Sequence, residues 1–190
     1  MTRRGFIGIA MAALAAFVER TAHAQVRSLP TLTPRDVERM QKDWKSLLAK
    51  DADVAADATP LKLTKDEWKK RLTAQQFDIL RQEGTERAGT SPLNQEKRPG
   101  VFACVGCGLP LFTSEMKYES GTGWPSFFTT IPKAFATSTD YKLLYPRTEY
   151  HCAKCGGHHG HVFEDGPQPT RQRWCNNGIA LRFVPATVKG

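Results

Sequence analysis

The spacing of apolar residues changes near residue 100, from a helical period before it to an alternating one after it. The first helical stretch begins at Thr33-Pro34, where threonine suits the N-cap and proline suits the first helical position. Apolar residues then follow mostly at intervals of three and four, at Val37, Met40, Trp44, Leu47 and Leu48. This pattern predicts an amphipathic helix with one apolar face.

A second helix is predicted after Thr64, because Thr64 and Glu67 form the sequence signature of a capping box. Gly84 ends this helix, whose apolar positions are Trp68, Leu72, Phe77 and Leu80. A polar loop follows, and in it Glu86 and Arg87 form either a solvated charge pair or a contact to the scaffold.

Beyond residue 100 the apolar residues lie in short runs bounded by glycine, proline and polar turns, which is typical of β-strands. Four such runs flank two C-x-x-C pairs, at 101–103, 109–112, 148–151 and 161–163. A last alternating run, from Ile179 to Phe183, predicts a half-buried strand. If that strand extends back to the preceding cysteine, period two puts on one face Cys175, Asn177, Ile179, Leu181 and Phe183.

Four of the five cysteines form the two C-x-x-C pairs, Cys104 with Cys107 and Cys152 with Cys155. Both pairs end in C-G between extended segments, which is the setting of a zinc knuckle, and two knuckles can close a tetrahedral four-thiolate site. Two disulfides or two redox-active pairs are the alternatives, but a redox-active C-x-x-C opens a helix. The sequence therefore favours one structural Zn²⁺ held by all four paired cysteines.

The N-terminus predicts an export signal over residues 1–24. Arg3-Arg4 precedes an apolar stretch from 7 to 18, and Ala22-His23-Ala24 has the small-x-small form of a cleavage site. We expect twin-arginine export of the folded protein to the periplasm, which lets the domain take up metal before it meets an oxidising compartment. The apolar stretch is too short to span a bilayer, so no stable membrane insertion is expected after cleavage.

The rest of the chain divides into an extension over 25–60, with a helix and an Ala/Asp-rich linker, and one domain over 61–190. The formal net charge is +8, but the basic residues are scattered in short runs. A solvated basic surface is therefore favoured over a nucleic-acid site.

Cys175 is the cysteine without a C-x-x-C partner, and it lies close in sequence to His158, His159 and His161. A thiol beside a polar amide, with an apolar floor beyond, is a plausible design for a nucleophile. Trp124 lies in a Gly-Trp-Pro segment, which cannot continue a helix and so predicts a loop. Composition alone favours a core position for its side chain.

Taken together, the motifs resemble the type B methionine-R-sulfoxide reductases over roughly Leu63 to Phe183. The match rests on several separated segments in the order typical of that family: W-K-K-R-L, G-T-E-R, the two C-x-x-C pairs, S-G-T-G-W-P-S-F, G-H-V-F-E-D-G-P, R-W-C-N-N and L-R-F. The resemblance implies a mainly β fold of two facing antiparallel sheets with a zinc-knuckle pair, to which the N-terminal helices are added.

The resemblance also implies roles for individual residues. Cys175 would attack the sulfoxide sulfur, Trp124 would hold the S-methyl group, and Asn177 matches the active-site amide. The active-site histidines of the family match His158 and His161, and Arg173 occupies the position of the arginine that lies two residues before the nucleophile.

The chemistry of these residue types agrees with the resemblance. Reduction of a sulfoxide needs a sulfur nucleophile, a proton donor for the departing oxygen and an aromatic wall for the methyl group. A histidine suits proton donation near neutral pH, and positive charge at Arg173 favours the thiolate. Oxidised proteins or peptides would be the substrates, and Cys175 would become a sulfenic acid.

The chain departs from the family at several positions. His159 and Asn176 stand where the family usually has apolar residues, and Trp174 stands where it usually has tyrosine. The sequence leaves open whether Asn176 and Trp174 alter access to Cys175, and neither removes the chemistry. Thr122 stands where many members have a resolving cysteine, so we expect an external thiol or a thioredoxin-like protein to reduce the sulfenic acid.

Two other functions are compatible with parts of this pattern. A non-catalytic zinc-ribbon binding module would share the scaffold, but it has no need of a fifth, unpaired thiol. A thiol-disulfide oxidoreductase would use the C-x-x-C pairs and lose the metal. Metal content separates the second alternative from a reductase, and sulfoxide turnover separates the first.

Overall fold

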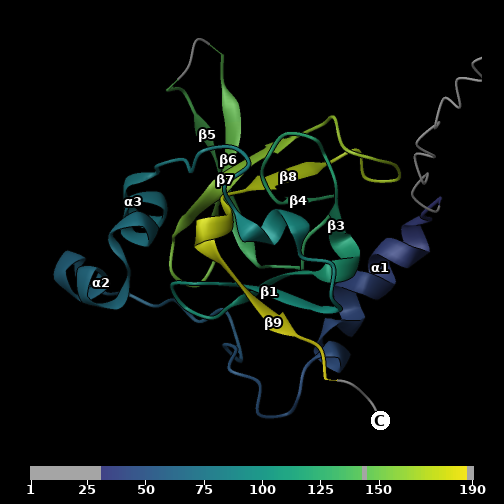
Figure 1. The fold of residues 1–190 in the computed structure, drawn as a ribbon, viewed down its shortest axis with the longest axis horizontal. Helices are drawn as coiled ribbons and strands as arrows, with labels where there is room; N and C mark the ends of the chain where they lie inside the picture. The colour runs from purple at the N-terminus through teal and green to yellow at the C-terminus, as the bar shows by residue number, and fades with distance from the viewer. Residues whose placement is uncertain (1–30, 143–144, 188–190) are drawn as a thin grey trace, which may run out of the picture. The chain divides into compact units, whose positions relative to one another are not determined.

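The computed structural model describes residues 31–142 and 145–187, so the predicted export signal lies outside the described residues (Figure 1). The helical elements precede most of the strands: α1 (Pro34–Lys42), η1 (Asp43–Leu47), α2 (Lys65–Arg71), α3 (Ala74–Gln82) and the short 3-10 turn η2 (Pro92–Gln95). Strands β1 to β5 are Gly100–Cys104, Pro110–Thr113, Lys117–Tyr118, Ser126–Phe127 and Phe135–Asp140, with η3 (Ser114–Met116) before β3. The remaining elements are β6 (Arg147–Cys152), β7 (His158–Phe163), β8 (Arg173–Asn176), η4 (Gly178–Ala180) and β9 (Leu181–Pro185).

The described strands form two antiparallel sheets, which confirms what the family resemblance implies. The smaller sheet has the order β2-β1-β9, and the larger one has the order β3-β4-β8-β7-β6-β5. The aromatic ring of Phe127 on β4 joins the two sheets in the core. It stacks on Phe112 of β2, with ring centroids 3.9 Å apart, and meets Phe102 of β1 edge-on at 5.1 Å. All three rings are fully buried, so this contact fixes one sheet against the other.

The single helix predicted after Thr64 is wrong, because two helices occupy that stretch. α2 ends at Arg71, and Thr73 then caps α3 with a second capping box formed with Gln76. Thr73-x-x-Gln76 is a start signal in its own right, and it interrupts the helix because an N-cap residue adopts an extended backbone. The apolar faces of both helices still pack on the domain, through buried Trp68 and Phe77.

The N-terminal extension packs on the domain through the predicted apolar face. Val37 and Met40 of α1 are buried, and the Gln41 side chain donates a hydrogen bond to Thr129 Oγ1 at 2.7 Å. The last turn of the predicted helix tightens into the 3-10 helix η1, whose Leu47 carbonyl accepts a hydrogen bond from the Thr187 amide near the end of the chain.

The prediction of one continuous strand face from Cys175 to Phe183 is also wrong. β8 ends at Asn176, and the turn η4 carries the chain from the larger sheet to the smaller one, where β9 pairs with β1. The Glu86 carboxylate accepts hydrogen bonds from the amides of Gly178 and Ile179 and so holds this turn. Ile179 is therefore a turn residue, and Leu181 and Phe183 belong to the other sheet.

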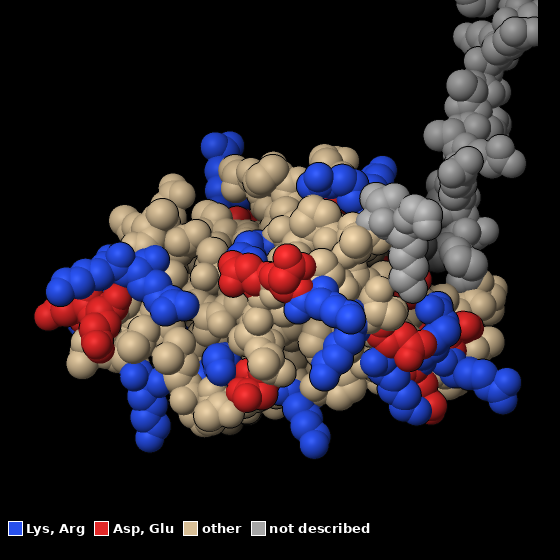
Figure 2. Space-filling view, turned by 90° about the horizontal axis from the view of Figure 1, so that it is seen from below, with Lys and Arg blue, Asp and Glu red and all other residues tan. Residues whose placement is uncertain are grey.

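The face of the molecule in Figure 2 shows lysine and arginine side chains spread over the surface and interspersed with acidic ones. Within the described ranges, none of the helices has the length and apolar character that a membrane span requires.

Candidate active site

Cys175 lies on β8 in the middle of the larger sheet, between β4 and β7. It is opposite Ser126 on one side and His161 on the other, and it is half-buried. A cavity of about 130 Å³ opens beside it. Four of the predicted site residues line this cavity together: Cys175, His161, Trp124 and Asn177. The structure thus brings into one small space residues that are up to 53 positions apart in the chain.

A β-bulge explains why His158 and His161 share a face of the sheet although an odd number of positions separates them. The register of β6 and β7 shifts between Tyr150 and His151, so that Tyr150 pairs with Gly160 and His151 pairs with His158. The bulge turns His159 into the core and leaves the rings of His158 and His161 with centroids 5.6 Å apart. His158 is buried next to His161 and is not among the residues that line the cavity.

Gly160 makes this arrangement possible because β7 and β8 approach closely there. Its φ is +155°, and a Cβ atom at this position would clash with the carbonyl oxygen of Cys175. Glycine is therefore required opposite the strand that carries the thiol.

The residues that depart from the family on β7 and β8 meet in the core. His159 Nδ1 lies 3.4 Å from Asn176 Oδ1, so two polar departures contact each other. The ring of Trp174 packs edge-on against Tyr150 with centroids 4.9 Å apart, on the sheet face opposite Cys175. Trp174 is not among the residues that line the cavity beside the thiol, because its side chain alternates to the inner face, whereas Asn176 is among them.

Burial and charge act in opposite directions on the Cys175 thiol. Burial raises its pKa, while the charge of Arg173 and hydrogen bonds from Thr122 and Arg173 lower it, and the net direction is upward. The predicted positive neighbour is present, but it does not bring the pKa below the ordinary value. Arg173 is itself bound by Asp165 through two hydrogen bonds of 2.7 and 2.8 Å, and its guanidinium lies over the Phe163 ring.

His161 has a carboxylate partner that the sequence analysis did not identify. Its Nε2 lies 2.8 Å from Asp140 Oδ2, and Arg147 donates to the same oxygen. Burial lowers the pKa of His161, and the hydrogen bond to Asp140 opposes that shift. The amide of Lys142, together with His161 and Arg147, holds the pKa of Asp140 well below its ordinary value. The carboxylate therefore stays ionised and fixes the orientation of the imidazole.

The pKa of His158 is lower than that of a free histidine. Burial lowers its pKa to about 4, although the nearby Glu149 carboxylate acts in the opposite direction. His158 is therefore neutral near pH 7.

The sequence leaves the role of Glu86 open, and the structure makes it a scaffold contact. It is 6% exposed, and its backbone carbonyl accepts a hydrogen bond from Trp124 Nε1 at 3.1 Å. Its backbone amide donates to Asn177 Oδ1 at 2.9 Å. One loop residue thus holds both the aromatic wall and the amide of the cavity. Burial raises the pKa of Glu86, and the amides of Gly178 and Ile179 oppose that shift.

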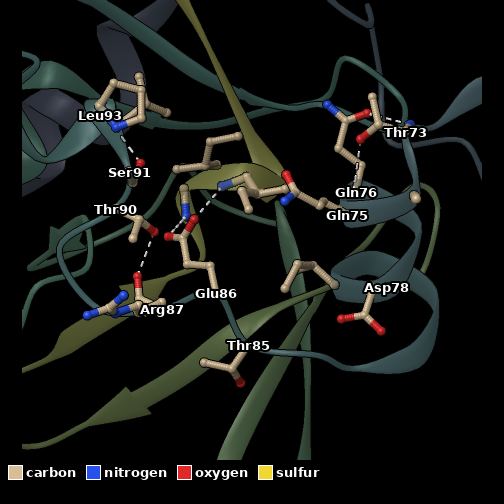
Figure 3. A pocket seen from close by; sticks show the side chains of 16 residues that line it. Thr73, Gln75, Gln76, Asp78, Thr85, Glu86, Arg87, Thr90, Ser91 and Leu93 are labelled. Atoms are coloured by element: carbon tan, nitrogen blue, oxygen red, sulfur yellow. Dashed lines mark hydrogen bonds between the residues drawn. The ribbon is translucent and has the colours of Figure 1, made fainter.

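A larger hollow of about 1060 Å³, which Glu86 helps to line, lies between α3, η2 and η4 (Figure 3). In Figure 3 the Glu86 carboxylate points toward the backbone of η4, while Thr85 lies beside it in the same loop. Thr85 lines both this hollow and the small cavity.

The four paired cysteines lie together in the turns of two hairpins, as predicted. All are buried, and their sulfur atoms lie within 4.8 Å of one another. Two of the separations are 3.7 Å, from Cys104 to Cys155, and 3.5 Å, from Cys107 to Cys152. These distances are too long for disulfides. They are close to the roughly 3.8 Å edges of a tetrahedron with metal–sulfur bonds of about 2.3 Å. The donor set and its geometry therefore fit one structural Zn²⁺.

An isolated thiol that faces an imidazole on the neighbouring strand, with an aromatic ring beside it, is the arrangement of a thiol-dependent enzyme. Comparison with known proteins agrees with this class. The SelR domain family matches residues 72–185. "Peptide methionine sulfoxide reductase MsrB" of Hahella chejuensis is 49% identical over 127 residues, which is 66% of this chain and 91% of that protein.

Two further relatives support the same family. "Peptide methionine sulfoxide reductase MsrB" of Leptospira interrogans is 48% identical over 119 residues, covering 62% of this chain and 91% of that protein. "Peptide methionine sulfoxide reductase B1, chloroplastic" of Arabidopsis thaliana is 50% identical over 122 residues, covering 64% of this chain and 60% of that protein. The chain therefore belongs to the SelR-domain family, the type B methionine sulfoxide reductases, and is an oxidoreductase acting on sulfur. It is not the non-catalytic binding module considered above.

Proposed function

We propose that this protein reduces the R sulfoxide of methionine residues in oxidised proteins, with Cys175 as the nucleophile. The observation that carries the proposal is the convergence of Cys175, His161, Trp124 and Asn177 on one cavity of about 130 Å³. A cavity of this size suits a methyl sulfoxide group rather than a large cofactor, and Trp124 provides the aromatic wall for the methyl group.

In the proposed reaction the Cys175 thiolate attacks the sulfoxide sulfur and forms a sulfur–sulfur bond. The sulfoxide oxygen takes up two protons, one of them from His161, whose imidazolium form Asp140 stabilises, and leaves as water. A water molecule then attacks Cys175 Sγ and loses a proton, and the electron pair of the sulfur–sulfur bond returns to the methionine sulfur, giving methionine and a sulfenic acid on Cys175. The raised pKa of Cys175 keeps the thiol protonated until substrate binds, and Arg173 supplies the positive charge that favours the thiolate.

The deciding experiment compares Cys175→Ser with the wild type on both epimers of a methionine sulfoxide peptide. We expect turnover of the R epimer by the wild type and no measurable turnover by the variant. Zinc content and melting temperature of the variant should match the wild type, because the cysteine cluster is untouched. Equal turnover of the S epimer, or appreciable activity of a folded Cys175→Ser protein, contradicts the proposal.

We further propose that an external thiol completes the cycle, by converting the sulfenic acid and two thiols into the cysteine, a disulfide and water. Thr122, whose side chain hydrogen-bonds toward Cys175, stands at the resolving position. One turnover without reductant should leave a dimedone-reactive Cys175 in the wild type. In Thr122→Cys it should leave a disulfide instead, since position 122 is already beside the thiol. An internal disulfide in the wild type that forms with full retention of zinc would overturn this scheme.

We propose zinc as the metal of the cysteine cluster and the periplasm as the site of action. The first rests on the tetrahedral spacing of the buried sulfurs, and the second on the Arg3-Arg4 signal and the Ala22-His23-Ala24 cleavage pattern. Metal analysis of the purified protein tests the first. Cell fractionation of the wild type against a variant with both arginines changed to lysine tests the second, because the twin-arginine route should reject the variant.

A further inference from the structure

A second group of metal-ligating side chains lies on the larger sheet, outside the cysteine cluster. Glu149 and His151 are two residues apart on β6 and therefore share a face, and His158 is opposite His151 on β7. The bulge described above turns His158 toward the same face. Two imidazoles and one carboxylate thus meet across a single hairpin.

The distances within this group suit a metal ion. Glu149 Oε1 lies 2.9 Å from His151 Nε2, and Glu149 Oε2 lies 3.4 Å from His158 Nδ1. Each residue offers one ligand atom, and the three atoms lie within 4.8 Å of one another. Ligands of a tetrahedral ion with bonds of about 2.0–2.1 Å are roughly 3.4 Å apart, so the group requires little movement.

Two of the ligand atoms are buried and have no hydrogen-bond partner among the described residues. They are Glu149 Oε2 and His158 Nδ1, on residues that are 8% and 2% exposed. Buried polar atoms are almost always satisfied, so an unsatisfied pair that faces each other needs an explanation. The 3.4 Å separation is too long for a good hydrogen bond, but an ion between the two atoms satisfies both.

The charge of the surroundings favours a cation. Two nearby basic side chains are already engaged: Arg147 pairs with Asp140, and Lys142 pairs with Glu83. Among the described residues, the Glu149 carboxylate is hydrogen-bonded only to the neutral hydroxyl of Ser138 and to His151. Asp140, Glu149 and His161 form an overlapping group, but Arg147 and His161 already occupy the Asp140 carboxylate.

From these observations we propose that Glu149, His151 and His158 bind one divalent transition-metal ion of the zinc type, in a site separate from the cysteine cluster. Imidazole nitrogen with carboxylate oxygen is a ligand set for such ions, and three protein ligands leave a position for water. His151, with 21% of its side chain exposed, provides the side from which the ion enters. The binding itself goes beyond the proposed reductase activity and does not depend on it.

Occupancy has a consequence for the catalytic cavity. The ion takes up Nδ1 of His158, whose ring lies 5.6 Å from that of His161, and places a double positive charge beside the proton donor. A bond from the ion to Nδ1 fixes the His158 ring, which packs edge-on against the His161 ring. Binding therefore restricts the movement of His161, and a free divalent metal lowers the rate of the reductase.

The test uses the full-length protein with its cysteine cluster already loaded with zinc. Equilibrium dialysis against buffered Zn²⁺ should show a second equivalent bound by the wild type. His151→Gln removes one ligand, and it should weaken that second equivalent by at least the roughly 10–100-fold that the loss of an outer-shell partner costs. Glu164→Gln, which removes an exposed carboxylate just beyond β7, is the matched control and should leave the affinity unchanged.

A cobalt spectrum identifies the ligands independently of activity. Co²⁺ bound in the second site should show weak visible bands without the strong sulfur-to-cobalt charge-transfer band of a thiolate site. The ratio of reductase rates with and without added Zn²⁺ should fall in the wild type and stay nearer to one in His151→Gln.

Three outcomes overturn the proposal. The first is that no second equivalent of metal binds. The second is that the second equivalent shows the charge-transfer band and so belongs to Cys175. The third is that its affinity is the same in the wild type and His151→Gln, which means adventitious surface binding. Failure of the reductase assay with retention of the second equivalent would instead count against the proposed function alone.

Discussion

The five cysteines of this chain occupy two regions with opposite properties. The four clustered sulfurs are buried in the turns of two hairpins, and each has other sulfurs within 4.8 Å. Cys175 is half-buried in the middle of a strand, and the side chains near it are a hydroxyl, an arginine and the histidine opposite. The surroundings of a thiol, rather than the group itself, therefore determine its role in this protein. Four thiols that point at one another make a structural centre, whereas one thiol that points at a cavity remains available for chemistry.

The largest effect is expected when one of the clustered sulfurs is removed. Cys152→Ser should release the metal and lower the free energy of unfolding by an amount on the order of 10 kcal/mol, the contribution of structural zinc in small domains. Chemical denaturation with parallel metal analysis measures both. The matched control is Cys175→Ser, which should keep metal and stability. A Cys152→Ser protein that loses its metal but unfolds at the wild-type denaturant concentration contradicts the structural role.

A smaller effect is expected from the imidazole that faces Cys175. His161→Ala should lower kcat by roughly 10²–10⁴-fold, because protonation of the leaving oxygen matters mainly in the transition state. KM should change little, since Trp124 and Asn177 still line the cavity. Steady-state kinetics on the R epimer separates the two constants. A wild-type kcat would mean that another group donates the proton, and His158 would be the next residue to change.

The smallest effect is expected from Glu86, whose replacement tests what keeps the residues around the cavity in place. Glu86→Ala leaves the amides of Gly178 and Ile179 without an acceptor, and an unsatisfied buried donor costs about 1–3 kcal/mol. Because the Glu86 backbone bonds to Trp124 and Asn177, the displaced loop should raise KM more than it lowers kcat. Glu86→Gln keeps one acceptor oxygen and should recover part of the loss. Equal KM in all three proteins would show that Glu86 only stabilises the fold.

Local signals in the sequence predicted much of the fold. The capping box at Thr64, the alternating strands and the C-G endings of the cysteine pairs are patterns that a few neighbouring residues determine. The second capping box at Thr73 was equally readable, but the apolar spacing across it concealed the break between α2 and α3. The break after Asn176 was less predictable, because alternation continues through the turn that changes sheets.

The candidate site was less accessible to sequence reasoning where its members act through distant contacts. Cys175 and the histidines belong to one short stretch, and Trp124 came from the family motif. Asp140 lies in a polar strand with no motif of its own, and only the pairing of β5, β6 and β7 places it beside His161. Glu86 had a signal in the G-T-E-R motif, but its burial depends on η4, more than ninety residues later in the chain.

The close approach of β7 and β8 at Gly160 limits how this sequence can vary. Every other amino acid adds at least one carbon where the Cys175 carbonyl oxygen already lies, so even alanine forces apart the strands that carry His161 and the thiol. Most positions tolerate a conservative replacement, but no amino acid can replace glycine conservatively at position 160. In a library that samples all twenty residues at each position, Gly160 should therefore be as intolerant as Cys175 itself, although glycine takes no part in the chemistry.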